Sequence, residues 1–207
     1  MEEKINIGKV QTSETEIKDL LKAWILISVA FAIAMTSQRY SSFDLYAFYL
    51  GFVAASLTAG IGFLFHELAH KIVAQKYGCK AEFRSFDNML IMAVVLSLFG
   101  VIFAAPGAVI ISGKIDKKKN GKISAAGPVA NIVLSLIFLL LLLFGPANLL
   151  KNWFYYGFFI NSLLALFNMI PFWLFDGYKI LKWNKLAYGL LMAIAFLLVI
   201  SKNFISN

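Results

Sequence analysis

A predominantly apolar run at residues 45–65 leads directly into His66-Glu67-Leu68-Ala69-His70, and this junction constrains the fold more than any other stretch. An apolar run of about twenty residues is long enough to cross a bilayer as a helix. Ionisable side chains at membrane depth are costly, so those that occur there are functional candidates. The sequence therefore predicts a membrane-spanning helix that carries chemistry near one of its ends.

His66 and His70 are the only histidines in the chain, and they are four residues apart. On a helix this spacing places both imidazoles on one face, about 6 Å apart along the axis, so that they can bind one metal ion. Glu67 then faces the open coordination position, where its carboxylate can take a proton from an attacking water. The pattern predicts metal-assisted peptide hydrolysis. The alternative, two core histidines that only hydrogen-bond to their neighbours, is disfavoured by the apolar run that precedes them.

Hydrophobic residues make up 60% of the chain and charged residues only 14%, which excludes a soluble globular protein. In a membrane protein, the net charge of +8 indicates loops that face the cytoplasm rather than nucleic-acid binding. With the spans given below, 16 of the 19 Lys and Arg residues lie on one side, and Arg39, Lys151 and Lys202 lie on the other. We therefore expect a multi-pass protein of the cell membrane, in contact with the lipid bilayer, with a cytoplasmic N-terminus.

Five apolar segments are expected to cross the membrane as helices, at residues 23–36, 44–76, 123–144, 153–174 and 186–200. A further run at 89–112 is long enough to cross, but basic clusters precede and follow it, so a single crossing would place one cluster outside. We expect a re-entrant hairpin instead, with a helix at 88–103 and, after Pro106-Gly107, an extended return at 108–112. The alternative is an ordinary transmembrane helix, which would make six.

The predicted fold class is an all-α polytopic membrane protein with five transmembrane helices and one re-entrant helix and β-strand hairpin. Residues 1–207 are expected to form a single integral membrane domain. Within it, residues 1–19 form a cytoplasmic lead, in which 13–19 can start a helix, and residues 45–180 form the catalytic core.

The third metal ligand can be identified by elimination. A catalytic zinc has three protein ligands, so with both histidines used the third is a carboxylate or Cys79. Apart from Glu67 and Asp176, the acidic residues lie in the lead, at the outer edge or in basic loops. The second and the penultimate helix both run inward, so Asp176 reaches the level of the histidines. The alternative is that Asp176 pairs with a lysine such as Lys179.

Three motifs in this order resemble the site-2 protease family of intramembrane zinc metalloproteases, in a compact form without a PDZ domain. They are His66-Glu67-Leu68-Ala69-His70, Gly127-Pro128-x-x-Asn131 and Asn168-x-x-Pro171-x-x-x-x-Asp176-Gly177. The resemblance implies one zinc ion held by His66, His70 and Asp176, with Glu67 as the general base. It also implies that Asn168 orients the substrate or the zinc site, and Asn131 is a candidate for the same role.

The expected function is hydrolysis of peptide bonds in the transmembrane segments of single-span membrane proteins. His70 lies six residues before Lys76, so we expect the active site near the cytoplasmic leaflet, open to water from that side. The extended return at 108–112 can hold an unwound substrate by strand addition. The alternative is a membrane metal-ion transporter or sensor that uses the same ligands but leaves Glu67 without a role. A scaffold without chemistry is disfavoured because the motif is intact.

Overall fold

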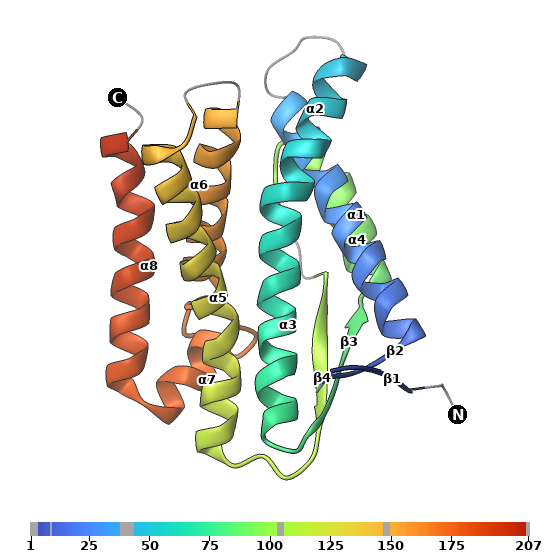
Figure 1. The fold of residues 1–207 in the computed structure, drawn as a ribbon, viewed down its shortest axis with the longest axis vertical. Helices are drawn as coiled ribbons and strands as arrows, with labels where there is room; N and C mark the ends of the chain where they lie inside the picture. Colours follow the sequence, from blue (N-terminus) through green and yellow to red (C-terminus); the bar gives the residue numbers. More distant parts are fainter. Residues whose placement is uncertain (1–3, 9, 38–43, 103–105, 147–149, 206–207) are drawn as a thin grey trace. The chain divides into compact units, whose positions relative to one another are not determined.

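The structure, a computed structural model, describes residues 4–8, 10–37, 44–102, 106–146 and 150–205. The chain divides into two compact units (Figure 1). Unit 1 consists of Met1–Leu64 and Ala81–Ile111, and unit 2 of Phe65–Lys80 and Ser112–Asn207. The long helix that ends in the histidine motif begins in the first unit and ends in the second.

Unit 1 opens with an antiparallel hairpin of β1 (Lys4–Ile7) and β2 (Val10–Ser13). The prediction of an all-α protein with a simple lead missed this hairpin. The remaining elements of unit 1 are, in order, α1 (Glu14–Ser37), α2 (Leu45–Ala55), the π-helical turn η1 (Ser56–Gly60), the start of α3 (Ile61–Lys76), β3 (Lys80–Ser85), α4 (Asp87–Ser97) and β4 (Gly107–Ser112). The helix start predicted at 13–19 is confirmed by α1.

The N-terminus of α1 is fixed by hydrogen bonds to side chains and holds β3 in place. The Glu16 backbone N–H donates to Ser13 Oγ at 3.2 Å, as in a helix N-cap. The Glu16 carboxylate is fully buried and accepts from Thr12 Oγ1 at 2.7 Å and from the Phe83 backbone N–H at 2.9 Å. Because a buried carboxylate is costly unless it is hydrogen-bonded, Glu16 ties β3 firmly to the start of α1.

The stretch predicted as a re-entrant hairpin forms a helix followed by a strand, but the helix is shorter than expected. It is α4, which has 11 residues and a length of about 16 Å, too short to cross a bilayer. The expected helix end at Phe103 lies outside the described residues. The Phe86 N–H donates to the Pro106 carbonyl at 2.9 Å, where β4 joins β3. The six-helix alternative requires one continuous helix here, which the structure does not have. Re-entry into the membrane stays a prediction.

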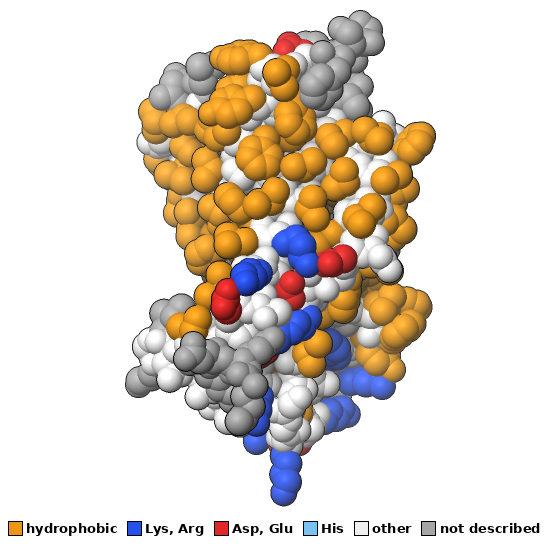
Figure 2. Space-filling model, turned by 90° about the vertical axis from the view of Figure 1, so that its right-hand side faces the viewer, with side chains coloured by type: hydrophobic (Ala, Val, Ile, Leu, Met, Phe, Trp, Pro, Cys, Tyr) orange, Lys and Arg blue, Asp and Glu red, His pale blue; other side chains and the backbone are white. Residues whose placement is uncertain are grey.

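Apolar side chains cover the upper part of the face formed by α1 and α4, and charged side chains gather below them (Figure 2). Ile91 and Val95 of α4 and Leu98, which directly follows it, are each about half exposed or more. An apolar face of this kind is typical of a surface in contact with lipid or protein.

Four helices among the described residues are long and apolar enough to cross a membrane. They are Glu14–Thr36, Leu45–Lys76, Lys117–Phe144 and Lys185–Ile205. The fifth predicted span, 153–174, corresponds to α6 (Leu150–Asn168), which is not among them, so the expected count of five is not confirmed. Polar side chains interrupt the apolar face of α6, and the helix ends three residues before Pro171.

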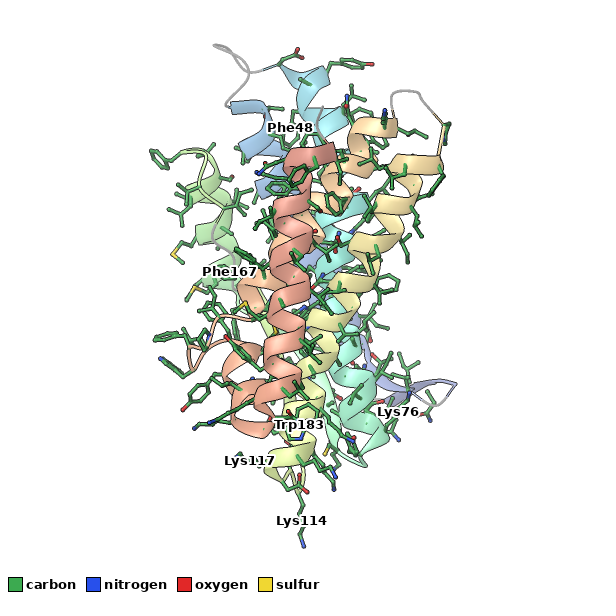
Figure 3. The ribbon with its side chains drawn as sticks, turned by 90° about the vertical axis from the view of Figure 1, so that its left-hand side faces the viewer. Phe48, Lys76, Lys114, Lys117, Phe167 and Trp183 are labelled. Carbon is green, nitrogen blue, oxygen red and sulfur yellow. The ribbon has the colours of Figure 1, made fainter. Side chains whose placement is uncertain are left out.

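Unit 2 contains the rest of α3 together with α5 (Lys117–Phe144), α6, α7 (Asp176–Trp183) and α8 (Lys185–Ile205). Asp116 caps α5, since its Oδ1 accepts from the Lys119 N–H at 2.6 Å. At one end of this unit lie Lys76, Lys114 and Lys117, with Trp183 close by (Figure 3). This end therefore carries a concentration of positive charge.

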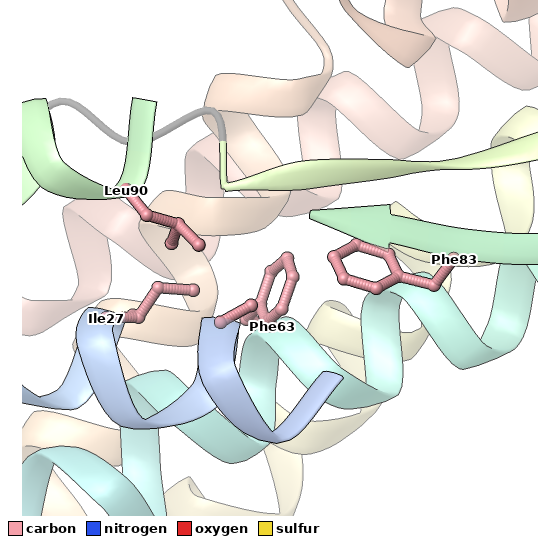
Figure 4. Packing of buried hydrophobic residues seen from close by; sticks show 5 residues of the cluster. Ile27, Phe63, Phe83 and Leu90 are labelled. Atoms are coloured by element: carbon pink, nitrogen blue, oxygen red, sulfur yellow. The ribbon is translucent and has the colours of Figure 1, made fainter. Parts of the chain in front are cut away.

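Each unit has its own hydrophobic core. In unit 1, Ile27, Phe63, Phe83 and Leu90 meet between α1, α3, β3 and α4, and the rings of Phe63 and Phe83 pack edge to face at 5.6 Å (Figure 4). In unit 2 the core joins α5, α6 and α8, and its buried members are Ile132, Phe158, Ala165, Ala195 and Leu198.

The small residues before the histidine motif serve helix packing. An ideal Cβ on Gly60 would lie 2.6 Å from Trp24 Cδ1, so the glycine lets α1 approach closely. Trp24 Nε1 also donates to the Ser56 carbonyl at 3.0 Å, within the π-helical turn. The contacts of Gly60 therefore indicate that this stretch serves close packing of a neighbouring helix.

Candidate metal centre

Three side chains in unit 2 bring their donor atoms together. His66 and His70 lie one turn apart on α3, and Asp176 is the first residue of α7. The two Nε2 atoms are 3.0 Å apart, and Asp176 Oδ2 lies 3.3 Å from His66 Nε2 and 3.0 Å from His70 Nε2. All three residues are buried. The structure thus brings together the three residues that the sequence predicts as ligands, although Asp176 lies 110 positions after His66 and 106 after His70.

The start of α7 is positioned by Gly177. A Cβ at this position would collide with the Met169 carbonyl and would lie 2.8 Å from Met169 Cα. Only glycine lets the chain pass so close to the end of α6, and this approach turns Asp176 into the unit. The pair Asp176-Gly177 therefore has one residue that supplies a donor and one that makes room for it.

The other ring nitrogen of each histidine is also hydrogen-bonded. His66 Nδ1 lies 2.6 Å from Asn131 Oδ1, and His70 Nδ1 lies 2.8 Å from the Ile123 carbonyl oxygen. A carbonyl oxygen can only accept, so each Nδ1 carries a proton, and in the neutral imidazole each Nε2 then presents its lone pair. Histidines that bind metal ions almost always donate their second ring N–H in this way.

The donor set fits a zinc ion. With both protons on Nδ1, two nitrogen lone pairs and a carboxylate oxygen converge, which is unfavourable unless a cation or a proton lies between them. Donor atoms of a tetrahedral zinc site with bonds of about 2.0–2.1 Å lie roughly 3.3 Å apart, close to the separations seen here. A Cβ on Gly127 of α5 would lie 2.5 Å from His66 Nε2, so glycine keeps space open beside the donors. Two imidazoles and one carboxylate also match a set found in catalytic zinc sites.

Asp176 interacts with a lysine as well. Its Oδ1 lies 3.8 Å from Lys179 Nζ, while Oδ2 faces the histidines. The two readings of the sequence for Asp176, metal ligand and partner of Lys179, are therefore compatible, because each uses a different carboxylate oxygen.

The remaining predicted site residues occupy different positions. Glu67 is half-buried on α3, directly after His66. Asn131 is fully buried and contacts His66. Asn168 is the last residue of α6. Its Nδ2 donates to the Leu164 carbonyl at 2.9 Å, a bond within its own helix that does not link it to the donors.

Three contributors to the site were not identified from sequence: Asn161, the Ile123 carbonyl and the close approach of Gly127. Asn161 lies in α6, is fully buried, and its Oδ1 accepts from Asn131 Nδ2 at 3.1 Å. The sequence feature that could have identified Asn161 is an amide within an apolar segment, because a polar side chain at membrane depth costs free energy unless it is hydrogen-bonded. A backbone carbonyl such as that of Ile123 leaves no signal in a sequence.

Comparison with known proteins gives consistent matches. The family model described as "Peptidase family M50" matches residues 54–148. "Putative zinc metalloprotease MJ0611" of Methanocaldococcus jannaschii is 41% identical over 181 residues, which is 86% of this chain and 89% of that protein. "Zinc metalloprotease MJ0392" of the same organism is 28% identical over 59% of this chain and 31% of its own length. "Putative zinc metalloprotease YwhC" of Bacillus subtilis is 31% identical over 61% of this chain and 66% of its own length. No solved structure matches significantly.

Proposed function

Because this chain belongs to peptidase family M50, the site-2 protease family of membrane-embedded zinc metalloproteases, we propose that it hydrolyses peptide bonds within transmembrane segments of single-span membrane proteins. The observation that carries the proposal is the convergence of two histidine nitrogens and one carboxylate oxygen next to the glutamate of the motif. A metal-ion transporter could use the same donors, but that function leaves Glu67 without a role.

His66, His70 and Asp176 are the proposed holders of one zinc ion. Zinc bound there supplies a Lewis acid that polarises the scissile carbonyl and activates water. Asn131 and the Ile123 carbonyl keep the protons of the two imidazoles on Nδ1, so both Nε2 atoms stay available as ligands. Burial of the three side chains excludes bulk water from the donors and strengthens their attraction for a cation.

Glu67 is the proposed general base. It lies three residues before His70 on α3, a spacing at which helical side chains are neighbours, so its carboxylate can reach the region of the donor atoms. Its carboxylate oxygen takes a proton from the attacking water and then delivers it to the nitrogen of the leaving amine. The half-buried position of Glu67 suits this role, because the group must meet both the donors and the incoming water.

We place the cytoplasm at the basic end of unit 2, where Lys76, Lys114 and Lys117 gather (Figure 3). Lysines on this end satisfy the positive-inside rule. His70 precedes Lys76 by six residues on α3, so the proposed site lies near the cytoplasmic leaflet. The distribution of Lys and Arg along the sequence supports a cytoplasmic N-terminus as part of the same proposal.

A substrate helix must be unwound before its peptide bonds can react. Among the described strands, β4 pairs with β3 in a sheet of two, so its second edge is the proposed place where an extended substrate adds as a third strand. This edge would supply main-chain hydrogen bonds that hold the substrate open.

The test is a cleavage assay with the purified full chain in detergent or proteoliposomes and a panel of single-span substrates, with and without a zinc chelator. We expect cleavage within a transmembrane segment that the chelator abolishes and added zinc restores. Glu67→Gln should abolish cleavage and leave zinc content near one ion per chain. Zinc flux across proteoliposomes without any cleavage would favour the transporter instead.

A further inference from the structure

A directed chain of hydrogen bonds runs from α6 to His66. Asn161 Nδ2 donates to the Gly157 carbonyl at 2.8 Å, Asn131 Nδ2 donates to Asn161 Oδ1 at 3.1 Å, and Asn131 Oδ1 meets His66 Nδ1 at 2.6 Å. Both asparagines are fully buried. A buried amide costs free energy unless its polar atoms are hydrogen-bonded, so this series of hydrogen bonds requires an explanation beyond helix packing.

The direction of these hydrogen bonds is set at the end farthest from His66, by the Gly157 carbonyl. The Gly157 carbonyl can only accept, so the Asn161 amide must turn its NH2 group toward it and its oxygen toward Asn131. Asn131 must then point its own NH2 group at Asn161 and its oxygen at His66. The orientation of the Asn131 amide therefore depends on Asn161, and Asn131 is the residue that meets the histidine.

His70 has no comparable dependence. Its Nδ1 meets the Ile123 carbonyl, a backbone acceptor that cannot be reversed. The acceptor for His66 is a side-chain amide, which presents either an oxygen or an NH2 group according to its orientation. With the amide reversed, His66 would carry its proton on Nε2, the atom that faces His70 and Asp176.

We propose that Asn161 is a positioning residue that holds the Asn131 oxygen toward His66 and thereby keeps His66 Nε2 free to bind zinc. The inference rests on the proposed function in one respect, that His66 is a zinc ligand. Residues behind zinc-binding histidines typically change metal affinity 10–100-fold when they are replaced, and Asn161 acts from one position farther away.

The first test measures the zinc dissociation constant of the purified full chain by competition with a chelator. Asn161→Leu, which is similar in size but has no amide, should weaken zinc binding by about tenfold or more. The matched control is Ser162→Ala. Ser162 is the next residue on α6, and its Oγ lies 2.7 Å from Ser135 Oγ on α5, so it joins the same two helices through a hydrogen bond of its own. The control should bind zinc as tightly as the parent.

The second test separates orientation from packing. In Asn131→Asp, both carboxylate oxygens are acceptors, so His66 Nδ1 meets an acceptor whichever way the group is turned. Adding Asn161→Leu to that variant should therefore cause no further loss of zinc affinity. An equal loss in both backgrounds would show that Asn161 acts through packing and would overturn the inference, as would parental affinity in Asn161→Leu alone.

Two further outcomes are distinguishable. A parent chain that binds zinc but cleaves no substrate contradicts the proposed function and leaves the zinc comparison valid. A parent chain that binds no zinc overturns both. If Asn161→Leu does not fold, as judged by thermal unfolding, Asn161→Ser removes the amide and leaves a hydroxyl that can bond within its own helix, and the same loss of zinc affinity is expected.

Discussion

Replacing Gly127 with Ala should weaken zinc binding by about 100-fold or more, although the same change usually stabilises a helix by about 0.5–1 kcal/mol. The added Cβ would lie 2.5 Å from His66 Nε2 and 2.6 Å from its Cε1, and it would also collide with His70 Nε2. Ordinary contacts of a Cβ are 3.4 Å or longer, so the shortfall is 3.4 − 2.5 = 0.9 Å. His66 cannot retreat freely, because its Nδ1 is held by Asn131 at 2.6 Å.

The size of the effect follows from this shortfall. Overpacking of a buried site costs about 1–3 kcal/mol, which outweighs the gain in helix propensity. Metal–ligand distances tolerate changes of only about 0.2 Å, so a displacement of 0.9 Å takes the ligands out of range. A misplacement of about 1 Å costs on the order of 100-fold in a preorganised site, and we expect at least this loss in zinc affinity and in cleavage rate.

The control is Gly189→Ala in α8, where a new Cβ meets nothing within 4 Å. Zinc affinity by chelator competition and thermal unfolding would be measured for the parent and both variants. Gly189→Ala should keep parental zinc affinity. Parental zinc affinity in Gly127→Ala would refute the reasoning, since it would mean that α5 does not lie against the two Nε2 atoms.

Three further changes test other contacts. Asp176→Asn keeps the shape of the side chain but removes its charge, and it should weaken zinc binding by more than about 100-fold, beyond the usual effect of residues behind the ligands; a titration with parental affinity would exclude Asp176 as a ligand. Glu16→Ala leaves the buried Phe83 N–H without this acceptor and should destabilise the protein by about 1–3 kcal/mol, measured by thermal unfolding; an unchanged midpoint would contradict this. Gly60→Ala places a Cβ 2.6 Å from the Trp24 ring and should cost about 1–3 kcal/mol in the same assay, whereas a stabilised variant would show that α1 yields easily.

The three donors of the metal centre could be predicted because few residues qualified. Only two histidines exist, their spacing requires a helix, and the structure places both on α3. Asp176 followed from charge distribution and helix direction, and the motif that ends in Asp176-Gly177 indicated the same residue. The residues that position the donors were harder to predict from the sequence. Asn161 is one of several polar residues in α6, and no sequence rule says which of them faces α5.

The fold was predictable where a segment is long and apolar. The helices at Leu45–Lys76, Lys117–Phe144 and Lys185–Ile205 agree with three of the expected spans to within a few residues at most ends. The hairpin of β1 and β2 was missed, because two strands of four residues carry too little periodicity to stand out from a polar lead. The bond from Glu16 to Phe83 joins residues 67 positions apart, and such pairs cannot be inferred from local pattern.

The metal centre and the hydrogen bonds of Glu16 to Thr12 and Phe83 depend on different parts of the chain. The donors and the asparagines behind them all belong to unit 2, whereas Glu16, Thr12 and Phe83 belong to unit 1. Zinc affinity and stability should therefore respond separately. Glu16→Ala should lower the unfolding midpoint and keep parental zinc affinity. Asn161→Leu should mainly weaken zinc binding and change the unfolding midpoint less. If Glu16→Ala instead weakened zinc binding as strongly as Asn161→Leu, the affinity would depend on the integrity of the whole chain, and the orientation of His66 would not be its main determinant.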